Sequence, residues 1–191
     1  MNSPQQRQPF QDIRTGFNLL AHLIDGYATA IVPFIRKDFG SAFFGVNALV
    51  AVLVMMVFGA MENDDTMLRY MFLWLLFVTA HRLDAGRAAR KGRIIHSRYT
   101  GDSWLANKLL PKAKRKTVQM LFEPALCMIA GVIICPQSPG IGKFLILGTF
   151  AVLMFNGSQR ALMQQRVRNM HDAHIEQQAT ARMFRGNSED F

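Results

Sequence analysis

The sequence predicts an all-α integral membrane protein, with four transmembrane helices arranged as two hairpins, an N-terminal amphipathic in-plane helix and basic cytoplasmic helices. Half of the 191 residues are hydrophobic, and they gather in blocks instead of being spread evenly. The first block, Ser41–Ala60, has about 20 residues without a charge, which matches roughly 30 Å of bilayer hydrocarbon at 1.5 Å per residue. The other blocks are Tyr70–Ala80, Val118–Cys135 and Phe144–Phe155.

The basic residues predict how these spans are oriented. Of the 22 Lys and Arg residues, 4 precede Phe39, 11 lie between Arg82 and Lys116, and 5 lie from Arg160 onward. The connection 61–66, MENDDT, has none. Because cytoplasmic loops collect Lys and Arg, we expect both termini and the middle segment on the cytoplasmic side and both short connections outside. The expected location is a bacterial inner (plasma) membrane.

The pattern divides the chain into five regions. The second span needs residues from about Met67 to Leu83 to be long enough, which places Arg69 near its outer end, where it can snorkel toward water. The regions are 1–40 (N-terminal interfacial helix), 41–83 (first transmembrane hairpin), 84–117 (basic loop with a short interfacial helix), 118–160 (second hairpin) and 161–191 (C-terminal cytoplasmic helix and tail).

The N-terminal region carries an apolar stripe whose members alternate steps of three and four. Such spacing predicts one amphipathic helix of about seven turns. Two placements are expected for it: in the plane of the inner leaflet, or packed over the spans of this protein or a partner. Gly16, Gly26 and Pro33 argue against a long rigid rod. The stripe consists of Phe10, Ile13, Phe17, Leu20, Ile24, Tyr27, Ile31 and Phe34.

The middle segment predicts a surface for anionic lipid headgroups or protein partners. Residues 99–103 are typical of a turn, in which Asp102 or Ser103 caps a short helix, WLANKLL, that ends at Pro111. The net charge of +9 also fits nucleic acid, but no recognition motif accompanies it. The residues expected to bind lipid or partners are Arg87, Arg90, Lys91, Arg93, Arg98, Trp104, Lys112, Lys114, Arg115 and Lys116.

A carboxylate, Glu123, lies within the third expected span and is followed by Pro124. It comes seven residues after Lys116, or about 10 Å along a helix axis, which is a shallow depth. We expect it to be buried against the bundle and hydrogen-bonded to Asn156 or His81. A structural role is favoured over a proton relay, because a relay needs a second ionisable group and the expected spans have none at mid-depth.

One face of the same span is expected to pack against another helix. Glu123, Cys127, Ala130 and Gly131 share this face, and small residues allow helices in a membrane to approach closely. Cys127 and Cys135 lie about 12 Å apart along the axis, too far for a disulfide.

The chain carries no recognisable catalytic or cofactor motif, so we expect no cofactor, no metal and no enzymatic activity. His171 and His174 are spaced for a metal pair but lack a third ligand on their helix. The leading hypothesis is a non-enzymatic subunit or scaffold of a membrane complex, with membrane lipids and other subunits or further copies as partners. The alternatives are a small oligomeric transporter or channel that uses Glu123, and a lipid-headgroup enzyme that uses His96 and Asp102.

Overall fold

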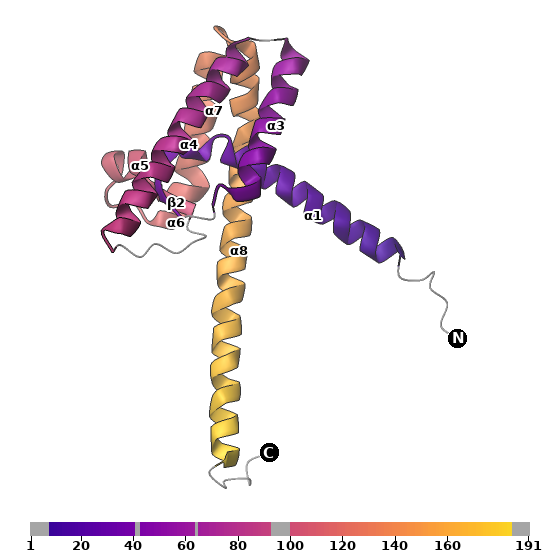
Figure 1. The fold of residues 1–191 in the computed structure, drawn as a ribbon, viewed down its shortest axis with the longest axis vertical. Coiled ribbons are helices and arrows are strands. Elements are labelled where there is room, and N and C mark those ends of the chain that lie inside the picture. The colour runs from indigo at the N-terminus through magenta and orange to yellow at the C-terminus, as the bar shows by residue number, and fades with distance from the viewer. Residues whose placement is uncertain (1–7, 41–42, 64, 93–99, 185–191) are drawn as a thin grey trace. The chain divides into compact units, whose positions relative to one another are not determined.

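The fold is almost entirely helical (Figure 1). The computed structural model describes residues 8–40, 43–63, 65–92 and 100–184. Two compact units divide the chain, Met1–Phe155 and Asn156–Phe191, and their boundary falls within the last helix. The elements are α1 (Gln8–Thr29), α2 (Val32–Ile35), β1 (Arg36–Phe39), α3 (Gly45–Glu62), α4 (Thr66–Arg90), β2 (Thr100–Ser103), α5 (Trp104–Leu109), α6 (Arg115–Thr117), the π-helix η2 (Val118–Phe122), α7 (Glu123–Ile134) and α8 (Pro139–Phe184).

The first unit has two ends with different composition. Figure 1 shows the short α3–α4 and α7–α8 connections at one end, which we name the connection end. The last turns of α4, with β2, α5 and α6, lie at the other, which we name the basic end. At the connection end, Lys143 Nζ donates to Glu62 Oε2 (2.6 Å), and the hydroxyls of Thr66 and Ser138 share a hydrogen bond. These contacts join α8 to the end of α3 and the α7–α8 connection to the start of α4.

Four stretches of described helix are long and apolar enough to cross a membrane: Asn18–Ile35, Gly45–Glu62, Arg115–Ile134 and Pro139–Arg182. Three of them overlap expected spans. The expected second span forms the helix α4 but does not belong to this set, since Arg69, His81 and Arg82 lower its hydropathy. The fourth stretch is instead the N-terminal Asn18–Ile35, which was expected to lie in the membrane plane.

The N-terminal stripe is not one continuous helix. Helix α1 ends at Thr29, and the chain bends before α2, which has Pro33 in its first turn. Pro is tolerated there because the first N–H groups of a helix have no partner within it. Burial divides the segment as well: Gly26 to Pro33 are buried except for the half-buried Tyr27, whereas Gly16 and Asn18 to Leu23 are exposed. The side chains of Phe10, Ile13 and Phe17 lie outside the described residues.

A two-stranded antiparallel sheet includes residues 100–103, where a turn was expected, and Tyr99 of the expected turn lies outside the described residues. Arg36 pairs with Ser103 and Lys37 with Asp102. Gly101 has a φ of 77°, and a Cβ atom there would lie 2.6 Å from the Lys37 carbonyl oxygen. Only glycine therefore fits at this point of the sheet, because it tolerates positive φ and has no Cβ.

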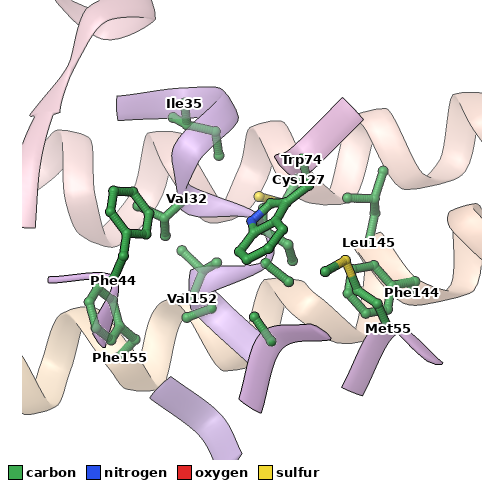
Figure 2. Packing of buried hydrophobic residues seen from close by; sticks show 14 of the residues in the cluster. Val32, Ile35, Phe44, Met55, Trp74, Cys127, Phe144, Leu145, Val152 and Phe155 are labelled. Carbon is green, nitrogen blue, oxygen red and sulfur yellow. The ribbon is translucent and has the colours of Figure 1, made fainter. Parts of the chain in front are cut away.

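The core of the first unit is rich in aromatic side chains. The Tyr27 ring stacks on Phe144 with centroids 4.7 Å apart, and its hydroxyl donates to the Phe144 carbonyl (2.8 Å). Close helix approach completes the packing, since a Cβ on Gly26 would lie 2.3 Å from Val50 Cγ1. Figure 2 shows core side chains gathered between the helices: Val32, Ile35, Phe44, Met55, Trp74, Cys127, Phe144, Leu145, Val152 and Phe155.

The second unit consists of the C-terminal part of α8. Every described side chain from Ala161 to Phe184 is exposed except that of Ala179, which is half-buried. The sequence of this segment has a broken stripe of large apolar residues, all of which are exposed: Leu162, Met163, Val167, Met170 and Phe184.

Candidate functional site

A buried ion pair joins two segments that lie 87 residues apart in sequence. Arg36 Nε donates to Glu123 Oε1 at 2.9 Å, and the Arg36 Nη2 group donates to Glu123 Oε2. Each side chain is 1% exposed. This two-point geometry matches the planar guanidinium to the planar carboxylate, the strongest form of such a pair. The structure thus brings Glu123 to a cation that the sequence analysis grouped with the cytoplasmic basic residues.

Local structure places each partner. Arg36 is the first residue of β1, directly after α2, and its Nη1 group donates to the Thr100 carbonyl of β2 (3.3 Å). Its guanidinium carbon lies 6.0 Å from the centre of the Phe155 ring. Glu123 is the first residue of α7, which continues directly from η2 as one helix. Several groups therefore compensate the two buried charges.

A π-helix precedes Glu123. Residues Val118–Phe122 form η2, and Pro124 follows in the first turn of α7. A π-turn adds a residue to the helical repeat, so it rotates the side chains that follow it relative to those before it. Glu123 and Pro124 are both buried, while Leu121 on η2 is 67% exposed.

Side chains of α4 and α5 supply donors to the interrupted backbone between α1 and β1. The bend leaves carbonyl groups without helical partners, and buried carbonyls require hydrogen bonds. The bonds run from Trp74 Nε1 to the Thr29 carbonyl (2.9 Å), from the Tyr70 hydroxyl to Ala30 (2.9 Å), between His81 Nε2 and Pro33 (2.9 Å), and from Trp104 Nε1 to Phe34 (3.2 Å). His81, expected near Glu123, thus bonds to the backbone of α2.

The small residues of α7 lie where a neighbouring helix comes close. Cys127 is buried and Ala130 is half-buried. A Cβ atom on Gly131 would lie 2.8 Å from Ile146 Cγ1 of α8. Asn156, the other polar partner expected for Glu123, is buried and belongs to the second unit.

The predicted lipid- or partner-binding residues lie at the basic end. Arg115 bonds to Asp102 (3.3 Å), and Arg87 pairs with Asp84 on the surface (3.2 Å). Ser103 Oγ accepts from the Ala106 N–H (3.4 Å), which confirms the predicted cap of the short helix. The exposed members are Arg87, Arg90, Lys91, Trp104, Lys112, Lys114, Arg115 and Lys116. Arg93 and Arg98 lie outside the described residues.

The histidines considered as metal or catalytic candidates belong to the second unit or lie outside the described residues. Within them, no group of three or more His, Cys, Asp and Glu side chains is arranged to hold a metal. His171 and His174 are exposed on α8, and His174 shares a hydrogen bond with Gln178 (2.9 Å). His96, part of the enzyme hypothesis, lies outside the described residues.

Comparison with known proteins adds no relative: no family model, no curated protein and no solved structure matches this chain.

Arg36 and the donors Tyr70 and Trp74 were not among the residues predicted from the sequence to form a site. One signal could have identified Arg36 as the partner of Glu123. Arg36 comes just before the first expected span and Glu123 lies near the cytoplasmic start of the third, so the two were expected at about the same depth. A buried carboxylate calls for a cation at its own depth. No local pattern marks the two aromatic donors, because their acceptors are exposed only by the bend.

Proposed function

We propose that this chain is a non-enzymatic multi-pass membrane protein that acts as a subunit or scaffold of a larger membrane complex. It docks partners and anionic lipid through its basic cytoplasmic segments. The observation that carries the proposal is a contrast in charge: the buried charges described in the first unit are paired inside the protein, whereas exposed basic side chains collect at one end.

The interior of the first unit supports a structural role. Among the described residues, every buried side-chain nitrogen or oxygen has a hydrogen-bond partner. Aromatic side chains fill the space between the helices (Figure 2). A transport pathway needs polar groups that are open to an ion or solute, and a close-packed, satisfied interior favours a scaffold instead.

Exposed apolar side chains support insertion in a membrane. Large exposed apolar surfaces on a protein mark contact with lipid or with other proteins. Helix α4 shares in this surface, so we assign the four spans to α3, α4, α7 and the first part of α8. The exposed residues include Val46, Leu49 and Leu53 on α3, Leu68, Phe72 and Leu76 on α4, Met128, Ile129 and Val132 on α7, and Leu147 and Phe150 on α8.

The charge pattern orients these spans. The connection end contains Glu62 and Asp65, while the basic end holds the Lys and Arg residues of the middle segment. By the positive-inside rule, the basic end and both termini face the cytoplasm of a bacterial plasma membrane. The basic end then lies beside the anionic inner leaflet.

The basic end suits an anionic leaflet in two ways. Each Lys or Arg near such a surface contributes about 1 kcal/mol of attraction, which salt screens. Trp104, Leu109 and Leu110 are 40%, 62% and 45% exposed, and they provide an apolar contact that salt does not weaken.

Native mass spectrometry of the full-length protein in mixed phosphatidylglycerol and phosphatidylcholine micelles tests the lipid part. The protein should retain phosphatidylglycerol preferentially, and the triple variant Lys112→Gln, Lys114→Gln and Lys116→Gln should lose most of this preference. The matched control, Arg166→Gln, Arg168→Gln and Arg182→Gln on the exposed part of α8, should keep it. Equal retention of both lipids by the parent protein would reject the lipid part.

The same spectra test the scaffold part. Protein purified in a gentle detergent should appear with stoichiometric partners or as a homo-oligomer. A clean monomer across several detergents would count against a subunit of a complex.

The second candidate is an oligomeric transporter with Glu123 in its pathway. The observation that favours it is the π-helix beside a buried carboxylate, because π-turns occur frequently at functional sites. Flux through proteoliposomes should then fall sharply in Glu123→Gln. Equal flux in the parent and this variant, measured on well-folded protein, would reject the candidate.

A further inference from the structure

The apolar N-terminal stretch is interrupted where a membrane span would be continuous. Residues Asn18–Ile35 have a mean hydropathy of 1.3, sufficient for crossing. Yet α1 stops at Thr29, and after α2 the chain leaves in an extended conformation at Arg36. Lipid offers no partners for freed backbone groups, so an interrupted segment at membrane depth has to be enclosed by protein. The donors from α4 and α5 meet this requirement.

Contacts before the bend lead toward the connection end. Gly26 lies against Val50, five residues or about 8 Å from the start of α3 at the basic end. The Ala30 carbonyl bonds to Tyr70, which is four residues or about 6 Å from the start of α4 at the connection end. The bend therefore lies deep within the first unit.

Contacts after the bend lead back to the basic end. The Pro33 carbonyl bonds to His81, fifteen residues or about 22 Å along α4. Arg36 then reaches the Thr100 carbonyl of β2. The exposed N-terminal part of α1 also lies away from the connection end, as Figure 1 shows.

We propose that residues 18–39 form a re-entrant element, which enters the membrane on the side of the basic end, turns back at Ala30 and Ile31, and is latched by the Arg36–Glu123 ion pair. Glu123 lies 87 residues after Arg36, so the latch closes only once α7 is in place. The ion pair then holds the element in its docked position.

The first test is the side of the membrane on which each flank lies. In a background of Cys127→Ala and Cys135→Ala, single cysteines at Asn18, Asn63 and Lys112 are labelled with a membrane-impermeant maleimide in vesicles of known orientation. Labelling at Asn18 should match Lys112 and oppose Asn63. Labelling of Asn18 on the side of Asn63 would show a crossing segment and overturn the proposal.

The second test measures the latch through Ala30→Cys in the same background. Glu123→Gln and Arg36→Gln should each raise its labelling rate by a membrane-permeant maleimide about tenfold or more, since each removes one charge of a buried ion pair. The paired variant Arg36→Met with Glu123→Leu removes both charges and should stay within about threefold of the parent.

An unchanged rate in both single variants would overturn the latch, and so would a paired variant as reactive as the single ones. Folding is checked in each variant by a single elution peak and by labelling at Asn63 that stays on its original side.

Discussion

Two ion pairs of the first unit use the same chemistry in opposite surroundings. Arg36 and Glu123 are each 1% exposed, whereas Arg87 and Asp84 are 73% and 70% exposed. Burial makes the first pair important for stability, because removing either charge would leave an uncompensated charge in the interior at a high cost in free energy. The second pair is screened by water and contributes little to folding. The buried pair therefore contributes to the fold, whereas the exposed pair is largely dispensable for it.

The largest effect should follow from breaking the buried pair. Glu123→Gln removes the negative charge that compensates the buried Arg36 guanidinium, so the free energy of unfolding should fall by about 3–5 kcal/mol. Unfolding by SDS in mixed micelles, followed by circular dichroism, measures this change. The matched control Asp84→Asn on the exposed pair should change it by less than about 0.5 kcal/mol. Equal effects at the two sites would remove the distinction between interior and surface.

Glycines extend the comparison to packing. Gly26→Ala places a Cβ atom 2.3 Å from Val50 Cγ1, so this variant should lose about 1–3 kcal/mol of stability. Gly86 on α4 has no atom within 4 Å of the same position, and Gly86→Ala should gain about 0.5–1 kcal/mol from helix propensity. The same unfolding assay measures both. A stable Gly26→Ala protein would mean that α1 does not approach α3 closely.

The donors to the interrupted backbone should have intermediate effects. Trp74→Phe removes the bond to the buried Thr29 carbonyl and should cost about 1–2 kcal/mol. Trp104 is 40% exposed, so in Trp104→Phe water can replace its bond to Phe34, and the cost should be below about 1 kcal/mol. Chemical unfolding of the two variants side by side ranks them. The reverse order would place the bend in water rather than in the protein interior.

The smallest effect on folding should come from the basic end. Changing Lys112, Lys114 and Lys116 to Gln should alter the free energy of unfolding by less than about 0.5 kcal/mol, because all three side chains are exposed. A large loss of stability would assign these lysines to the fold instead of to lipid.

Helices and their ends could be predicted from local sequence. The hydrophobic blocks predicted three of the stretches that are long and apolar enough to cross a membrane. The Ser103 cap was predicted because this residue lies directly before the helical segment WLANKLL. These features depend on neighbouring residues only. The same reasoning identified Glu123 as unusual, because a carboxylate within an apolar stretch is visible without a structure.

Long-range features were not accessible in the same way. The partner of Glu123 is 87 residues away, and the adjacent Lys37 made Arg36 resemble an ordinary membrane-edge cation. The strands RKDF and TGDS show no apolar alternation, so nothing local predicts their pairing. Gly26 and Pro33 indicated that the N-terminal helix would be interrupted. The position of the bend could not be predicted, because it depends on hydrogen-bond donors from α4.

The most direct test of this account is a double-mutant cycle between Arg36 and Glu123. The free energy of unfolding is measured for the parent, Arg36→Met, Glu123→Leu and the paired variant in the same micelles. We expect a coupling energy of about 2 kcal/mol or more, with the paired variant more stable than either single one. A coupling energy near zero would contradict it, because the two side chains would then contribute to the fold independently.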